Sequence, residues 1–384
     1  MADFSAKDAG LGYLYQARYA LWQLLKPPEE QELVLETLDD IVLDQPGSAL
    51  DLLQTKHHIT PANLTNTSPE LWKTLRIWSS HLKEGAINIP PSRLVLVTTA
   101  IAAEGSIAAT LRPGGDADLE SIASALSGIA DKSENEALKP AFAAFNSLTN
   151  EQRIQLVSAI QILDGSPNIS DVADRIREHI RPAVDRGNRE AVFERLEGWW
   201  FGQVILQLEA KTPTPVTGFE VYDKLRAIAD QFKPDALPID FLEADPGTVD
   251  AKADTRMFVM QLRAIEVGLT RIEKAILDYY RAYEQRSRWA REELLVGGEV
   301  ERYEKQLIDE WQRFAASVAD ELGKPATELQ LEKAGRDIFK WMEQAADIRI
   351  RRNVTEPYVM RGSYHILANE AKPRVWWHPN SLKG

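Results

Sequence analysis

The 384-residue chain contains no cysteine. Disulfide bonds, thiolate metal sites and cysteine nucleophiles are therefore excluded from its stability and its chemistry. No apolar run approaches the roughly 18 residues that a membrane-spanning helix needs. The first residues also lack the basic-then-apolar order of a signal peptide. We therefore expect a cytoplasmic protein with no membrane partner.

Positive charge is scarce as well. The chain has 45 Lys and Arg against 58 Asp and Glu, a net charge of −13, and residues 1–110 carry eight basic against thirteen acidic side chains. General electrostatic attraction to nucleic acid needs a basic surface. The charge argues against a lone, high-affinity DNA binder, so DNA affinity would have to come from oligomerisation or from a partner. The sequence has no Gly-x-x-x-x-Gly-Lys-Ser/Thr phosphate loop, and we expect no ATP hydrolysis by this chain.

Polar side chains gather at the ends of two predicted strands near the N-terminus. An acidic β-type stretch over residues 33–43 is followed by a turn at Gln45–Ser48 and a second β-type run over residues 50–56. Side chains alternate between the two faces of a strand, so Gln54 and Lys56 point the same way. An acidic residue on one strand followed by Gln-x-Lys on the next is the layout of a metal-dependent nuclease.

That layout predicts specific roles. Asp40 and Glu36 would supply oxygen ligands for Mg²⁺, with Mn²⁺ expected to substitute, and the Gln54 side-chain carbonyl or the backbone beside it would add another. Lys56 would orient the attacking water and offset charge that builds on the scissile phosphate. As bare spacing, however, the same residues also occur in exposed hairpins that have no catalytic role.

Several assignments stay open at this point. Asp39 and Asp40 are adjacent, and only one of them can face Lys56 on a regular strand. Asp40 would lie on the same strand face as Glu36 and is therefore preferred as the metal ligand, although a bend would exchange the two aspartates. Glu36 is either a ligand or a charge at the end of a strand.

Two further residues are candidates for support of the site. Gln16 either hydrogen-bonds near the site or caps the first helix. His57 either touches phosphate or is, like its neighbour His58, an ordinary surface residue.

The remaining pattern predicts three parts, residues 1–110, 111–235 and 236–384. The first has the order helix, three short strands, helix, strand and is mixed α/β. From Gly114 onward we expect helices only, over Leu119–Ile129, Leu138–Leu148, Gln152–Leu163, Val172–Ile180, Asn188–Leu208 and Gly218–Phe232. After a linker at residues 233–254, a long helix carries an apolar stripe from Leu262 to Tyr283, and a second follows from Glu299 to about Leu322. Two long helices of this kind predict an assembly device.

The C-terminal tail holds the main basic cluster. Its members are Arg349, Arg351, Arg352 and Arg361. They would contact either a DNA backbone or an acidic surface of a partner, and the acidity of the whole chain favours the partner.

Two sets of motifs resemble known families. A helix with Gly12-Tyr-x-Tyr-Gln16, a strand ending in Glu36-x-x-Asp-Asp40 and a strand ending in Gln54-x-Lys-His57 together resemble the double-stranded-DNA endonuclease domain of bacterial anti-phage systems. That domain is a branch of the PD-(D/E)xK restriction-endonuclease-like superfamily. Gln54 replaces an acidic residue of the general pattern and removes one negative ligand. The tail motifs Arg361-Gly-Ser-Tyr-x-x-Leu-Ala and Trp377-His-Pro resemble the C-terminal domain of ABC-three-component systems, the group that includes Lamassu.

These resemblances imply a fold and a function. The fold would be an α/β restriction-endonuclease-like N-terminal core, then a mostly α-helical subdomain packed on it, then an α-helical C-terminal docking domain. The chain would be the Mg²⁺-dependent double-stranded-DNA endonuclease of a Lamassu-type system. An SMC-like ABC ATPase and a third subunit would hold it inactive until release lets it self-associate and cut with little sequence preference. The alternative is a catalytically inactive nuclease-fold adaptor that binds DNA or partner subunits.

Overall fold

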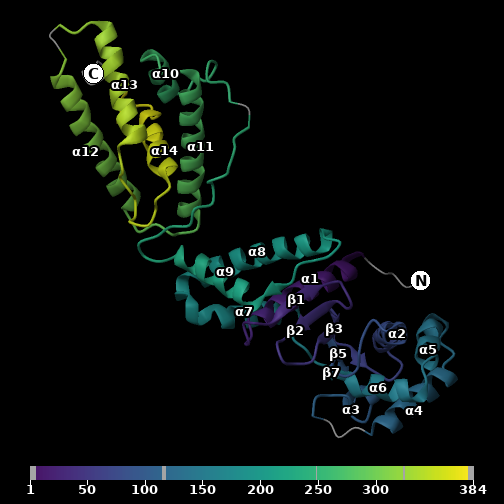
Figure 1. Cartoon of the computed structure of the whole chain (residues 1–384). Coiled ribbons are helices and arrows are strands. Elements are labelled where there is room, and N and C mark those ends of the chain that lie inside the picture. Colours follow the sequence, from purple (N-terminus) through teal and green to yellow (C-terminus); the bar gives the residue numbers. More distant parts are fainter. Residues whose placement is uncertain (1–5, 115–117, 248, 323–324, 379–384) are drawn as a thin grey trace. The chain divides into compact units, whose positions relative to one another are not determined.

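The computed structural model describes residues 6–114, 118–247, 249–322 and 325–378 (Figure 1). Its internal contacts divide the chain into two compact units, residues 1–229 and 230–384. All strands of the described residues belong to the first unit, and the described elements of the second are helices. Within the described ranges, no helix combines the length and the apolar character that crossing a membrane requires.

A mixed six-stranded sheet forms the centre of the first unit, in the order β7-β5-β3-β2-β1-β8, and β4 and β6 form a separate parallel pair. The strands are β1 (Glu32–Leu35), β2 (Ile41–Asp44), β3 (Asp51–Lys56), β4 (Asn63–Leu64), β5 (Arg93–Thr98), β6 (Ile101–Ala102), β7 (Ile160–Leu163) and β8 (Val216–Thr217). β2 is antiparallel to both β1 and β3, whereas β5 runs parallel to β3 and β7 parallel to β5. Among the parallel strands, β5 has a continuous apolar run, and its residues 94–98 are buried, as is typical of a strand covered on both faces.

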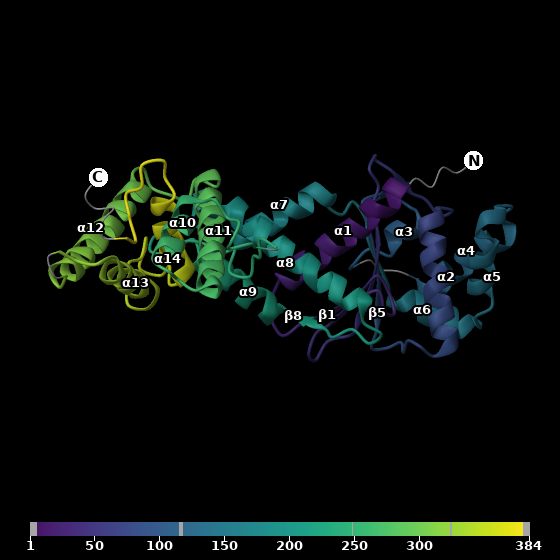
Figure 2. The same cartoon turned by 90° about the horizontal axis from the view of Figure 1, so that it is seen from above.

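Helices of the first unit pack as two groups. They are α1 (Ala6–Leu24), α2 (Pro69–Glu84), α3 (Ile107–Thr110), α4 (Leu119–Lys132), α5 (Lys139–Asn146), α6 (Asn150–Ala159), α7 (Ile169–Ile180), α8 (Arg189–Glu209) and α9 (Gly218–Asp230), with 3₁₀ turns η1 (Glu136–Leu138), η2 (Arg181–Ala183) and η3 (Arg186–Asn188). α1, α7 and α8 pack together next to β1, and Figure 2 shows α1 and α8 crossing there. α2, α4, α5 and α6 pack together in the other group. Trp78 of α2 and Leu52 of β3 belong to one apolar core, so the face of β3 that carries Gln54 and Lys56 is directed toward α2.

The predicted order of elements through residue 99 is confirmed, with the two-residue strand β4 added. The prediction that strands stop at Gly114 is wrong, because β7 and β8 complete the two edges of the sheet. The predicted helix Gln152–Leu163 ends at Ala159, and Ile160 has an extended backbone with φ −78° and ψ 133°. Four residues are too few for periodicity to distinguish a strand from the end of a helix, and pairing with β5 decides the outcome.

The second unit is a helical bundle. Its helices are α10 (Met257–Ala264), α11 (Leu269–Arg291), α12 (Glu299–Asp320), α13 (Glu328–Gln344) and α14 (Pro357–Ala368). α14 lies among α11, α12 and α13 (Figure 1) and contributes Tyr364 and Leu367 to their shared apolar core. Its closest approach to α11 is at Gly362, where an added Cβ would overlap the Asp278 carbonyl group and the Ala282 side chain. Glycine is therefore required by contact between the two helices.

One long helix was predicted where the structure has α10 and α11. The helix breaks after Ala264 because Glu266 adopts a left-handed backbone with φ 56°, and α11 restarts after Gly268. Leu262 and Ile272 nevertheless remain in the same apolar core. The apolar stripe was therefore a correct indication of burial and a wrong indication of continuity.

Gly362→Ala tests the close contact of α11 with α14. The added methyl group overlaps backbone, which moves less readily than a side chain, so we expect the unfolding free energy to fall by about 1–3 kcal/mol. Gly202→Ala in α8 is a matched control, because nothing lies within 4 Å of its added Cβ. Alanine there favours the helix by about 0.5–1 kcal/mol. Denaturation followed by circular dichroism would measure both; an unchanged Gly362→Ala protein would contradict the contact.

His365 predicts a pH dependence of stability in the second unit. Burial lowers its pKa to about 3, and the charges of Arg256 and Arg361 act in the same direction. Its ring lies 4.9 Å from that of Phe258 and 5.9 Å from that of Trp377, measured between ring centroids. The unfolded chain binds the proton near pH 6.5, so His365 contributes stability that is complete above pH 6.5 and is lost as the pH falls toward 3.

The measurement is urea denaturation of wild type and His365→Leu at pH 7 and pH 5. One such histidine lowers the free energy of unfolding by about 1.4 kcal/mol for each pH unit below 6.5. We therefore expect wild type to lose about 2 kcal/mol more than the variant between the two pH values. Equal losses would show that His365 accepts a proton in the folded protein.

Candidate functional site

The bend between β1 and β2 brings two aspartates to the end of β3. The two strands pair as a hairpin with Leu35 opposite Ile41, so residues 36–40 form their connection. Glu36 opens the bend in a left-handed conformation, φ 52°, and its N–H donates to the Asp40 carbonyl oxygen at 3.1 Å. The Gln16 amide of α1 donates to the same carbonyl oxygen at 2.5 Å. Helix α1 thus helps to hold the bend in place, and Gln16 lies next to the candidate site.

The Asp40 carboxylate binds the end of β3. Its Oδ2 accepts hydrogen bonds from the Thr55 backbone N–H at 2.8 Å and from the Thr55 hydroxyl at 3.1 Å, and its Oδ1 accepts from Gln54 Nε2 at 2.9 Å. Lys56 Nζ lies 3.6 Å from Oδ2. The Asp40 and Lys56 side chains retain 20% and 28% of their exposure, so both groups reach solvent.

Asp39 is more deeply buried than Asp40. Its Oδ2 accepts a hydrogen bond from Trp78 Nε1 of α2 at 2.6 Å, and its Oδ1 accepts from the Gln54 amide. Burial raises the pKa of the Asp39 carboxyl to about 6, and the adjacent Asp40 charge adds to the rise, while the hydrogen bonds from Trp78 and Gln54 oppose it. Both aspartates therefore contact Gln54, a possibility that strand parity alone did not allow.

Three oxygen atoms converge on the Lys56 ammonium group. Besides Asp40 Oδ2, they are Gln54 Oε1 at 2.9 Å and the Thr55 carbonyl oxygen at 3.1 Å. The same oxygens, one carboxylate with two neutral carbonyl groups, would suit Mg²⁺, which binds proteins through one or two carboxylates and keeps several waters. The ammonium group marks where a cation is stabilised. No cluster of three or more His, Asp or Glu side chains suited to a metal occurs among the described residues.

Other predicted residues are placed differently. The Glu36 side chain is exposed, and its described contacts include none with Asp40, Gln54 or Lys56. His57 packs against the Tyr15 ring of α1, with 4.9 Å between ring centroids. Burial lowers the pKa of His57, and the neighbouring His58 lowers it further.

Two contributors were missed in the sequence. Thr55 was treated only as the spacer of Gln-x-Lys, yet its N–H and hydroxyl hold Asp40. Trp78 was not among the predicted site residues. A buried indole N–H needs an acceptor, and that requirement was the available signal.

A cavity of about 450 Å³ adjoins the end of β3. It is lined in part by Thr55, Lys56, His57, His58, Glu70 and Lys73. His58 Nε2 lies 2.6 Å from the Glu70 carboxylate. The cavity therefore offers a space beside Lys56 that is lined by one further lysine, Lys73, and by the carboxylates of Asp8 and Glu70.

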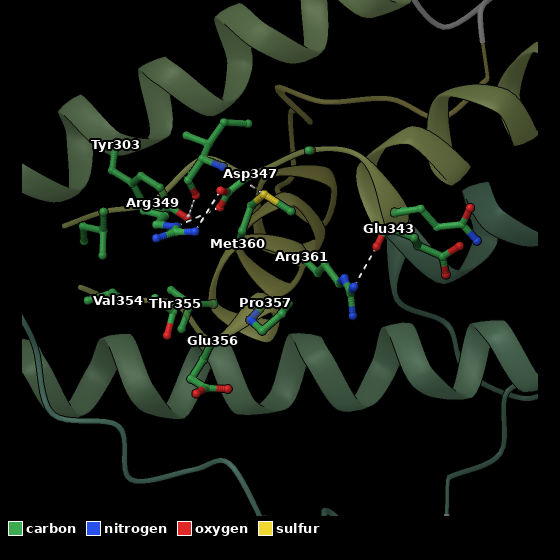
Figure 3. A pocket seen from close by; sticks show the side chains of 15 residues that line it. Tyr303, Glu343, Asp347, Arg349, Val354, Thr355, Glu356, Pro357, Met360 and Arg361 are labelled. Carbon is green, nitrogen blue, oxygen red and sulfur yellow. Dashed lines mark hydrogen bonds and ion pairs between the residues drawn. The ribbon is translucent and has the colours of Figure 1, made fainter. Parts of the chain in front are cut away.

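The basic cluster of the second unit is largely used within the fold. Arg351 pairs with the Glu299 carboxylate through two contacts of 2.7 and 2.8 Å and also donates to the Ala236 and Leu294 carbonyl oxygens. Figure 3 shows Arg349 paired with Asp347 and Arg361 directed to the Glu343 carbonyl oxygen, beside a cavity of about 280 Å³.

The members of this cluster therefore differ in availability. Arg349 and Arg352 are exposed, whereas Arg351 connects the loop after α13 to the start of α12. An interface role predicted for all four arginines does not suit Arg351.

Comparison with known proteins bears on the second unit. Residues 258–383 match the family model of C-terminal domain 7 of the ABC-three component (ABC-3C) systems. The match supports membership of such an anti-phage system. It confirms the resemblance predicted for the tail, although Pro379 of the Trp-His-Pro motif lies outside the described residues. No curated protein matches the chain significantly.

Solved structures of Cap4 receptors that contain a SAVED/CARF domain share a low similarity with this chain. The Acinetobacter baumannii receptor is 12% identical with a TM-score of 0.32, and the match covers 59% of this chain and 47% of that one. The Moraxella osloensis receptor is 14% identical with a TM-score of 0.33, covering 72% and 69%. The chain thus spans about half the length of the first of these receptors. Scores this low do not define its fold.

Proposed function

We propose that this chain is a Mg²⁺-dependent DNA endonuclease, the effector subunit of a Lamassu-type ABC-three-component system. The observation that carries the proposal is the convergence of Asp40 Oδ2, Gln54 Oε1 and the Thr55 carbonyl oxygen on one cation position. Carboxylate, Gln and Lys lie there at the ends of neighbouring strands, as in the restriction-endonuclease-like pattern. The family match at the other end of the chain supports the cellular setting.

Each residue would have a distinct role. Asp40, Gln54 and the Thr55 carbonyl group would hold the ion, which would supply an acidified water and offset charge on a phosphodiester. The Lys56 ammonium group would then orient the nucleophile and stabilise negative charge on the phosphate. The cavity beside Lys56 would receive the scissile phosphate.

Regulation would come from assembly. A chain with net charge −13 attracts DNA poorly by itself. The C-terminal unit would dock the chain on an SMC-like ABC ATPase and a third subunit, which hold it inactive. Release would let the chain self-associate and cut double-stranded DNA with little sequence preference.

A nuclease-fold adaptor without catalytic activity is the alternative. Its supporting observation is that Asp40 already has hydrogen-bond partners for both oxygens, and that among the described residues Lys56 pairs with one carboxylate, that of Asp40. Such a cluster is stable without any ion. Metal affinity and cleavage separate the two functions.

Cleavage of plasmid DNA with Mg²⁺ tests the proposal first. We expect Lys56→Ala to lower the rate by at least about 100-fold, because it removes a preorganised positive charge. Lys83→Ala, which removes the same charge from an exposed position at the end of α2, should cut like wild type.

Two other results of the same assay would contradict the nuclease activity or the catalytic role of Lys56. Wild type that is inactive alone at high concentration and within a DNA-stimulated complex would favour the adaptor. Loss of complex formation by Lys56→Ala would instead point to a structural lysine.

Calorimetric titration with Mn²⁺ tests the ion site separately. Wild type should release heat on binding, and Asp40→Ala should not, because the single charged ligand is gone. Asp44→Ala removes an equal charge from an exposed position at the end of β2 and should bind like wild type. Equal heats from wild type and Asp40→Ala would favour the adaptor.

A further inference from the structure

The side-chain amide of Gln54 has to face one particular way for the proposed site to work. Only its oxygen is useful to a cation, whereas its NH₂ group would repel one. Oxygen and nitrogen are almost the same size, so shape does not distinguish the two orientations. The neighbouring donors and acceptors must set the choice.

A directional chain of hydrogen bonds makes that choice. The Trp78 indole N–H can only donate, and it donates to Asp39 Oδ2 at 2.6 Å. An ionised Asp39 can only accept, so its Oδ1 requires a donor and receives the Gln54 NH₂ group. The same NH₂ group donates to Asp40 Oδ1 at 2.9 Å. Gln54 Oε1 is thereby left on the side of Lys56, 2.9 Å from Nζ.

Burial makes the wrong orientation unfavourable. Trp78, Asp39 and Gln54 are 0%, 6% and 3% exposed. With so little access to water, an acceptor facing an acceptor keeps its full desolvation penalty. Lys56 also donates to Oε1, but a bound ion would replace that donor. The contact of the Gln54 NH₂ group with Asp39, and that of Asp39 with Trp78, do not involve Oε1 and would remain.

We propose that Trp78 and Asp39 are positioning residues that orient the Gln54 amide, so that its carbonyl oxygen faces the cation position. Asp39 in this role is not a second metal ligand. The orientation of Gln54 rests on the donor and acceptor pattern alone. Its effect on catalysis rests on the proposed function. It also gives each of the adjacent aspartates a separate task, Asp40 at the ion and Asp39 behind Gln54.

Two substitutions of Asp39 separate orientation from charge. Asp39→Asn and Asp39→Ala remove the same charge. In Asp39→Asn, Trp78 would hold the new side-chain oxygen, and the new NH₂ group would face Gln54 and turn it the wrong way. In Asp39→Ala the Gln54 NH₂ group can still donate to Asp40 Oδ1, and Oε1 remains free to face the ion.

The readout is the affinity of the full chain for Mn²⁺ alone, measured by calorimetry. We expect Asp39→Asn to bind about 10- to 100-fold more weakly than wild type, and more weakly than Asp39→Ala. Thermal stability should rank in the opposite order, because alanine leaves a cavity and an unpaired Trp78 N–H. An asparagine variant that binds Mn²⁺ as well as the alanine variant, or better, would overturn the proposal.

A second substitution that restores the pairing of donor and acceptor between residues 39 and 54 should restore the affinity for Mn²⁺. A carboxylate has no wrong orientation, so Asp39→Asn combined with Gln54→Glu lets the new NH₂ group donate to the new carboxylate. We expect the double variant to recover Mn²⁺ affinity at least about tenfold over Asp39→Asn, as restoring an outer-shell partner predicts. No recovery would count against the orientation chain.

A measurement without metal tests the orientation of the Gln54 amide independently of the proposed nuclease activity. Nuclear magnetic resonance of the Gln54 side-chain amide, assigned by its loss in Gln54→Glu, reports its acceptors directly. Both amide protons should move upfield in Asp39→Asn, where the Asp39 carboxylate is gone. If wild type binds no Mn²⁺, the proposed nuclease fails while this shift still decides the orientation. If Mn²⁺ binds and the shift is absent, the orientation chain fails alone.

Discussion

The hydrogen bonds from β3 to two adjacent carboxylates are the interactions on which the site depends. Asp39 and Asp40 lie side by side in a bend, one of them almost fully buried. Buried carboxylates are unfavourable unless donors satisfy them. Gln54, Thr55 and Trp78 supply those donors, and they connect the β1–β2 hairpin to β3 and to α2. The same contacts leave the Gln54 carbonyl oxygen on the side of the Lys56 ammonium group.

Charge has a different use in the second unit. Its arginines mostly pair within the fold: Arg351 with Glu299, and both Arg286 and Arg374 with the buried Glu304. Those contacts hold the pKa of the Glu299 and Glu304 carboxyls below the usual range, for Glu299 mainly through Arg351 and for Glu304 against the opposing effect of burial. Breaking such a pair leaves a buried charge without a partner, which is strongly destabilising. This unit, whose residues 258–383 match an ABC-three-component domain, thus uses its ion pairs to hold its own helices and loops together.

Much of the first unit followed from local chemistry. The turn at Gln45–Ser48 was predicted and occurs. The Leu and Val run of β5, and the helix α2 with Pro69 at its start and Gly85 after its end, also have strong local signals. β7 and β8 have four and two residues, and only pairing with β5 and β1 makes them strands. The predicted single helix through Leu262–Tyr283 failed at Glu266, where one left-handed residue interrupts it without disturbing the apolar stripe.

The sequence by itself determined which chemical groups were available: a pair of adjacent aspartates, Gln-x-Lys at the end of a strand, and a family-specific tail. Tertiary structure decided their partners. It directed Asp39 to Trp78, Asp40 to Thr55 and Arg351 to Glu299, and it left Glu36 exposed. Partners of this kind come from elements 14 to 52 residues apart in sequence. Strand parity and helical periodicity indicate only which side chains share a face of one element. They carry no information about contacts across a bend or between elements.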